Sequence, residues 1–119
     1  MTHQEMADYL AEKLLGRELD DTKVSASQPV WVSANGGEMF SYDWHPQDDI
    51  GQCFEYIVSA MKKKYGFNHN NGFILTIKES EGDKWYCEFP LPAWEDATAD
   101  TPEAAIVEAA YQAVKASEK

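Results

Sequence analysis

The stretch 49–65 constrains the fold more than any other part of the chain, because its apolar residues recur at helical spacing. Asp48 and Asp49 stand at its start, where a carboxylate caps free N–H groups and favours the positive end of the helix dipole. Lysines 62–64 fall in its last turn and Gly66 follows, which marks the C-terminal end. The sequence therefore predicts an amphipathic helix with a buried apolar face made of Ile50, Phe54, Ile57, Val58, Met61 and Tyr65.

Signals for a helix also occur near each end of the chain. Thr2 and Glu5 have the capping-box spacing at the start of residues 2–15, and Gly16 is placed to end that helix in a left-handed turn. Thr101 is placed as the N-cap of a last helix, and the proline after it suits the first helical position. The apolar stripe of this helix is narrow and mostly small, so it can approach a sheet closely: Ile106, Ala110, Ala113 and Val114.

Two pairs of β-prone runs lie between these helices. Runs 29–34 and 38–42 are separated by Asn35-Gly36-Gly37, which predicts a hairpin because Asn and Gly tolerate the positive φ of a tight turn. Runs 72–79 and 84–89 predict a second hairpin around a Ser-Glu-Gly-Asp turn. On its returning strand one face carries Trp85, Cys87 and Phe89.

The remaining segments are expected to be irregular. Residues 17–28 are polar and are expected to form a loop, and residues 93–100 a connector that holds Trp94. Together these elements predict an α+β fold, in which a small antiparallel sheet of two hairpins is layered with three helices in the order α-ββ-α-ββ-α. The length of 119 residues fits one domain, 1–119, with a hydrophobic core of its own.

The charge of the chain limits its partners. With 21 acidic against 10 basic residues, the net charge is −11, which repels nucleic acid and anionic lipid. We therefore expect neither direct nucleic-acid binding nor membrane binding. Two interpretations of the acidity stay open. It serves solubility alone, or it forms an acidic face that meets a basic surface, such as the nucleic-acid groove of another protein.

The location of the protein is predicted from what its sequence lacks. There is no apolar run near the ~20 residues that cross a bilayer. The start, Met1-Thr2-His3-Gln4-Glu5, has neither the basic nor the apolar region of a signal peptide. We expect a cytoplasmic protein of a bacterial cell, in which Cys53 and Cys87 are reduced thiols within the core.

The arrangement of several segments resembles the phage ABA-sandwich domain, found in tailed phages and prophages. These segments are residues 11–16 (AEKLLG), the helix after Asp48-Asp49, the FILTIKE and KWYCEF strands, and the last helix (TPEAAIVEAAYQAV). The last helix resembles the family pattern at Thr101, Pro102, Ala105, Ile106, Ala109 and Ala110. The resemblance implies helix–sheet–helix layering and a phage or prophage origin. It implies no particular activity.

Motifs for catalysis or cofactors are weak. Asp43, His45, Asp48 and Asp49 could bind a divalent cation, but they match no known ligand spacing, and capping of the helix at 49–65 explains the two aspartates. The run 68–72 (NHNNG) suits a turn, and its amides could also contact a ligand. No phosphate loop, Gly-x-Ser-x-Gly or Cys-x-x-Cys motif occurs. We therefore expect no enzymatic activity, no metal and no cofactor.

Aromatic residues around the first hairpin form the most unusual feature. Large aromatics carry much of the binding energy at protein interfaces, and they also fill cores. Phe40, Tyr42 and Trp44 would share one face of a strand, so that face could equally be core. If it binds a partner, the binding residues are Trp31, Asn35, Glu38, Tyr42, Asp43, Trp44 and His45.

Three hypotheses for function follow. The first is a non-enzymatic phage or prophage accessory protein that binds a host protein, for instance as an acidic inhibitor of a nucleic-acid-binding host or defence protein. The second is a module that binds a small, nucleotide-like ligand, in an oligomer if a subunit interface forms the site. Its weakness is that the only cluster of lysines, 62–64, is already explained by the helix dipole. The third is a metal-dependent hydrolase using Asp43, His45 and Asp48.

Overall fold

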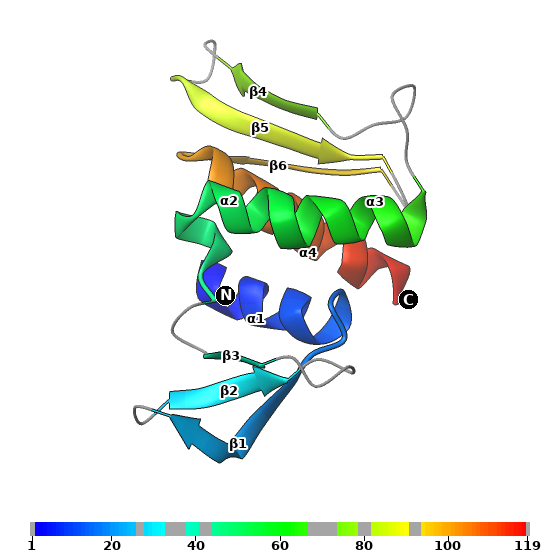
Figure 1. Cartoon of the computed structure of the whole chain (residues 1–119). Coiled ribbons are helices and arrows are strands. Elements are labelled where there is room, and N and C mark those ends of the chain that lie inside the picture. The colour runs from blue at the N-terminus through cyan, green and yellow to red at the C-terminus, as the bar shows by residue number, and fades with distance from the viewer. Residues whose placement is uncertain are drawn as a thin grey trace.

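The structure is a computed structural model. It shows two sheets at opposite ends of the molecule with the helices between them (Figure 1). For residues 18–25, 28–32 and 38–40 it describes the backbone alone. All of the residues described are 2–25, 28–32, 38–40, 44–66, 74–78, 82–90 and 94–118.

The first helix, α1 (His3–Lys13), begins at the predicted capping box. The Thr2 hydroxyl accepts a 3.1 Å hydrogen bond from the N–H of Glu5, and the Glu5 carboxylate accepts one of 3.0 Å from the N–H of Thr2. After the helix, Gly16 adopts a left-handed φ of +67°, as predicted. Both ends of the helix are therefore set by local sequence.

The central helix runs continuously through α2 (Ile50–Gln52), the π-helical segment η3 (Cys53–Val58) and α3 (Ser59–Tyr65). The Asp49 side chain caps it by accepting from Gln52 N at 3.2 Å, and Gly66 ends it with a φ of +72°, as predicted. A 3₁₀ turn, η2 (Pro46–Asp48), comes before it.

The predicted apolar face of this helix is confirmed in its second half and wrong in its first. Ile57 and Met61 are fully buried, whereas Ile50 and Phe54 are exposed. The π turn is the physical reason, because its wider turn rotates the residues on either side of it relative to one another. Cys53 points into the core where regular helical spacing places Phe54.

The first sheet has the strand order β1 (Glu18–Ser25), β2 (Gln28–Val32), β3 (Glu38–Phe40), all antiparallel. The hairpin of β2 and β3 is as predicted, with Trp31 paired to Met39. The loop expected over 17–28 is wrong, because most of it forms β1. Ladder hydrogen bonds come from the backbone, so a polar composition does not exclude a strand.

The second sheet has the order β4 (Ile74–Lys78), β5 (Lys84–Phe89), β6 (Glu95–Ala99), again antiparallel. Pairing of β4 with β5 confirms the second predicted hairpin. The connector expected over 93–100 is wrong, because it contains β6. The two hairpins also lie in separate sheets rather than in one. The α+β class, with three helical regions between antiparallel strands, is confirmed.

The last helix, α4 (Pro102–Ser117), lies at the centre of the core, in contact with α1, η3, β5 and β6 (Figure 1). Thr101 caps it through a 3.1 Å bond from Ala104 N. Its buried surface is much wider than the predicted stripe, since Ala105, Val107 and Ala109 are also buried. Small side chains on most sides let these neighbours pack closely around one helix.

Candidate functional site

Trp44 lies in the core rather than on a binding surface. Its side chain is only 1% exposed, and its indole Nε1 donates a 2.8 Å hydrogen bond to the carbonyl of Ala7 in α1. The ring of Tyr56 meets it edge-on at 5.8 Å. Of the two interpretations of the aromatic cluster, the core interpretation therefore holds for Trp44, because a buried indole needs a hydrogen-bond partner and has one here.

The other predicted binding residues are placed only in part. His45 is half-buried, and its backbone N–H donates to the Gln52 side chain at 3.0 Å. Trp31 and Glu38 lie on β2 and β3, where the backbone alone is described. Asn35, Tyr42 and Asp43 lie outside the described residues, as does the run 68–72.

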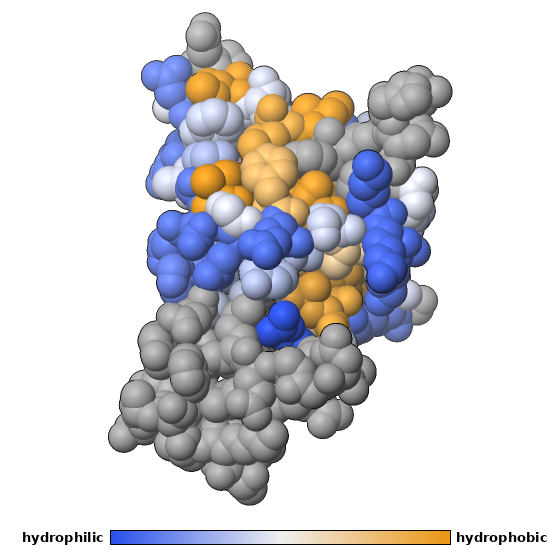
Figure 2. Space-filling model, in the orientation of Figure 1, coloured by the Kyte–Doolittle hydropathy of each residue, from blue (hydrophilic) through white to orange (hydrophobic). Residues whose placement is uncertain are grey.

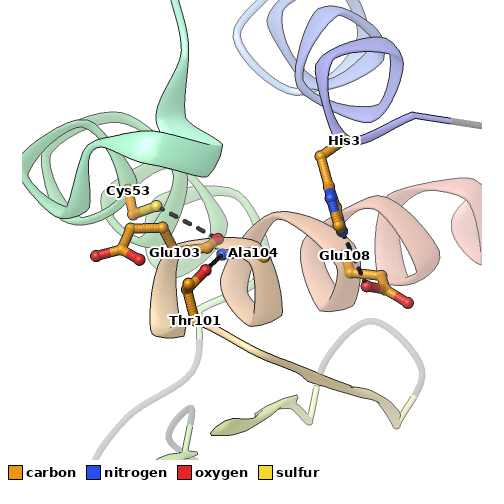
Figure 3. Close-up of polar contacts among 6 residues, drawn as sticks. All are labelled: His3, Cys53, Thr101, Glu103, Ala104 and Glu108. Atoms are coloured by element: carbon orange, nitrogen blue, oxygen red, sulfur yellow. Dashed lines mark hydrogen bonds and ion pairs between the residues drawn. The ribbon is translucent and has the colours of Figure 1, made fainter. Parts of the chain in front are cut away.

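Both cysteines are buried free thiols, as predicted. Cys53 Sγ donates to the carbonyl of Pro46 at 3.0 Å and lies 3.8 Å from that of Glu103 (Figure 3). Burial raises the pKa of the Cys53 thiol to about 12, and burial also raises the pKa of Cys87. A thiol held protonated in the core lacks the character of a nucleophile.

The residues predicted as possible cation ligands are not shown to form a site. Asp49 caps the central helix, Asp48 is exposed in η2, and Asp43 lies outside the described residues. Within the part of the chain that the structure describes, no three His, Cys, Asp or Glu side chains gather closely enough to hold a metal ion. In the same residues, no helix has the length and apolar character needed to span a membrane.

A shallow hollow of about 460 Å³ lies between the start of α1, the middle of α4 and the ends of β5 and β6. Its lining carries two ion pairs. His3 Nε2 lies 3.2 Å from Glu108 Oε2 (Figure 3), and Lys84 pairs with Asp100 and lowers the pKa of that carboxyl by its hydrogen bond. His3 and Lys84 each already face a carboxylate, so the hollow offers no surplus positive charge to a phosphate.

The strongest arrangement of polar and aromatic groups lies on the second sheet, on the face turned away from α4. Cys87 and Phe89 of β5 are buried on the α4 side, so the alternate residues Tyr86 and Glu88 point to the other face. The register places Ile74 and Asp96 on either side of Glu88. We call this surface the Trp94 face; it comprises Ile74, Lys78, Tyr86, Glu88, Trp94 and Asp96.

Glu88 is the centre of the Trp94 face. It is only 7% exposed, and its Oε1 accepts two hydrogen bonds of 2.6 Å, from the Tyr86 hydroxyl and from the indole Nε1 of Trp94. The bond to Glu88 favours the protonated phenol and so raises the pKa of Tyr86. These two donors compensate the cost of burying a polar group.

Trp94 is held by that bond yet stays 65% exposed, more than any other large apolar side chain in the described part of the chain. The ammonium of Lys78 lies 4.3 Å from the centre of the Tyr86 ring, so that ring is already covered. The indole of Trp94 is therefore the open aromatic surface of this face, fixed in direction before any partner arrives. Asp96, which is exposed, adds a carboxylate beside it.

Sequence reasoning missed this site, although part of the signal was present. The alternation within β5 predicts that Tyr86 and Glu88 share the face opposite Cys87. The sequence does not join Trp94 to them, because residues 93–100, which include Trp94, are expected to form a connector. Trp94 directly precedes β6, and the pairing of β6 with β5 brings it beside Glu88.

The fold is similar to that of a phage protein. A crystal structure at 2.0 Å of a phage protein from Bacillus cereus ATCC 14579 superposes with a TM-score of 0.66, covering 97% of this chain and 89% of that one. Sequence identity is 15%, so the likeness concerns the fold alone. No family model and no curated protein matches the sequence. The resemblance to the ABA-sandwich family stays a prediction.

Proposed function

We propose that this protein is a phage or prophage accessory protein that acts in the bacterial cytosol by binding a host protein, without catalysing a reaction. The observation that carries the proposal is the exposed indole of Trp94, fixed by a hydrogen bond to the buried carboxylate of Glu88. A large aromatic whose direction is set in advance loses little entropy on binding. Such residues are typical anchors of protein interfaces.

The charge around Trp94 defines the chemistry of the partner. Asp96 lies on the same face, and the chain as a whole carries a charge of −11. An arginine side chain suits this surface, because its planar guanidinium stacks on an indole while its N–H groups pair with a carboxylate. We expect a partner with a basic surface, such as a host or defence protein that binds nucleic acid. Binding in the nucleic-acid groove of that partner would then keep the nucleic acid out.

The similarity of the fold to a phage protein supports a phage or prophage origin by association. The hypothesis of a nucleotide-like ligand gains less support, because Lys84 and His3 in the hollow are each paired with a carboxylate. An interaction surface is therefore the better account of what the described residues offer.

A capture experiment with matched variants tests the proposal. The immobilised protein is incubated with lysate of a bacterial host, and the retained proteins are compared for wild type, Trp94→Ala and Phe54→Ala. Phe54 is the control, because it is another exposed aromatic on a different element. We expect a protein that wild type and Phe54→Ala retain and Trp94→Ala loses, and whose retention falls steeply with salt. Equal retention by all three would refute the Trp94 face as the binding surface.

A further inference from the structure

Strand β4 is an edge of the second sheet. The strand order is β4-β5-β6, so one side of β4 pairs with β5 and its other side faces outward. Figure 1 places β4 at the upper end of the molecule, where it is the strand of its sheet that lies farthest from the helices. An edge strand presents backbone N–H and C=O groups that can pair with another chain, and proteins commonly protect such edges.

The side chains of this edge are apolar on both faces. Ile74 lies on the Trp94 face and is 45% exposed, while Ile77, paired with Trp85, lies on the opposite face and is 46% exposed. Figure 2 shows apolar side chains in the upper part of the molecule, over the second sheet and the central helix. A helix or loop that covered one face would leave the other isoleucine in water. A strand added at the edge covers part of both.

The charge of the chain indicates which strand can pair with the edge of β4. A chain with a net charge of −11 repels a second copy of itself, unless the two meet where carboxylates are missing. The sequence of β4 is Ile-Leu-Thr-Ile-Lys, which contains no carboxylate and ends in Lys78. Contact between two β4 strands therefore avoids the repulsion that other parts of this acidic surface would cause.

The strand is also complementary to itself. We propose that β4 pairs antiparallel with β4 of a second copy about a two-fold axis at Thr76, which joins two three-stranded sheets into one. In this register Thr76 faces its own copy. Leu75 faces Ile77 of the second copy, so apolar residues meet apolar residues. Ile74 faces Lys78 of the second copy, whose aliphatic stem can cover it.

This inference is independent of the proposed function. Trp94 lies beside β6, the opposite edge of the sheet, so its indole stays open in the dimer, although Ile74 and Lys78 at the β4 edge of the Trp94 face meet the second copy. The dimer would present two such faces on one continuous sheet. A failure of either proposal leaves the other standing, because one concerns β4 pairing with itself and the other concerns an aromatic anchor.

Thr76 provides a direct test, since its side chain is exposed and lies on the proposed axis. The molar mass is measured by size-exclusion chromatography with light scattering over a series of concentrations. Wild type is expected at twice the chain mass of 13.4 kDa. Thr76→Glu and Thr76→Lys each place like charges opposite one another and are expected to be monomers. An equimolar mixture of the two variants is expected to restore the dimer.

Thr98→Glu is the matched control, because Thr98 is also exposed but lies on β6, away from the axis. It should remain a dimer, and circular dichroism should show that all variants are folded. A wild type that is monomeric at every concentration would overturn the inference. A dimer that survives both Thr76 variants would do the same, and failure of the mixture to dimerise would rule out the register centred on Thr76.

Discussion

The indole Nε1 of Trp94 donates a 2.6 Å hydrogen bond to Oε1 of Glu88, which links the most exposed large apolar side chain described in this protein to a buried carboxylate. A mobile surface tryptophan would lose rotamer freedom on binding, whereas this one has lost it on folding. The bond therefore serves both folding and recognition. It satisfies a buried acceptor, and it directs an aromatic ring toward solvent.

Removal of the Glu88 side chain should destabilise the protein. Glu88→Ala leaves the Trp94 indole without its acceptor and leaves the Tyr86 hydroxyl the longer 3.3 Å contact with Asp96, at a cost of about 1–3 kcal/mol in the free energy of unfolding. Glu88→Gln keeps an acceptor oxygen and should cost less. Urea denaturation measures both. Asp96→Ala, at an exposed carboxylate on the same face, should change the stability by less than about 0.5 kcal/mol. Equal stability of Glu88→Ala and wild type would contradict this account of the bond.

The two tryptophans Trp44 and Trp94 should differ strongly in their effect on stability. Trp44→Ala removes a buried side chain and its bond to the Ala7 carbonyl, so we expect a loss of about 3–5 kcal/mol. Trp94→Ala removes an exposed ring and one of the two donors to the buried Glu88, and should cost about 1–2 kcal/mol. Thermal or urea unfolding of the two variants decides. Similar losses for both would mean that Trp44 is not in the core.

The N-cap of α4 should contribute measurably to stability. Thr101 Oγ1 accepts from Ala104 N at 3.1 Å, and Thr101→Ala removes that acceptor, with an expected loss of about 1 kcal/mol. Thr101→Ser keeps the hydroxyl and should restore most of the stability. Urea midpoints of the three proteins make the comparison, and a serine variant as unstable as the alanine variant would show that the cap is not the cause.

The buried Cys53 thiol should make stability fall at alkaline pH. Burial raises its pKa to about 12, whereas an unfolded thiol ionises near pH ~8.5. Because the folded-state pKa is the higher one, the protonated Cys53 thiol makes its full contribution to the free energy of unfolding below about pH 8.5. This contribution is lost as the pH rises toward 12, by up to about 1.4 kcal/mol per pH unit. Unfolding free energies measured between pH 7 and pH 10 should fall less steeply for Cys53→Ala than for wild type. Parallel slopes would contradict the prediction.

The elements that could be predicted from sequence are those whose signals are local. The capping box at Thr2 and Glu5, the cap at Thr101 and the left-handed Gly16 and Gly66 each depend on a few adjacent residues, and all are confirmed. Hairpin pairing was predicted for the same reason, since a short turn brings the two strands together.

The elements that were missed carry no apolar pattern or turn signal of their own. Strand β1 is polar and exists through pairing with β2, and β6 is held by β5 on one side and α4 below it. The π turn at Cys53–Val58, which exposes Phe54, is likewise indicated by no local sequence motif, and this segment contacts α4. The Trp94 face was missed with β6, because a site that forms only when two strands pair cannot be predicted from either strand alone.

The central claim is that Trp94 is the anchor of a binding face, and the indole N–H signals of the protein test it most directly. In ¹⁵N-labelled protein, the signals of Trp94 and Trp44 are assigned from Trp94→Phe and Trp44→Phe and followed while the captured host protein is added. The account predicts that the Trp94 signal shifts or broadens, while that of Trp44, bonded to Ala7 in the core, changes little. A partner that binds and leaves the Trp94 signal unchanged would contradict the account.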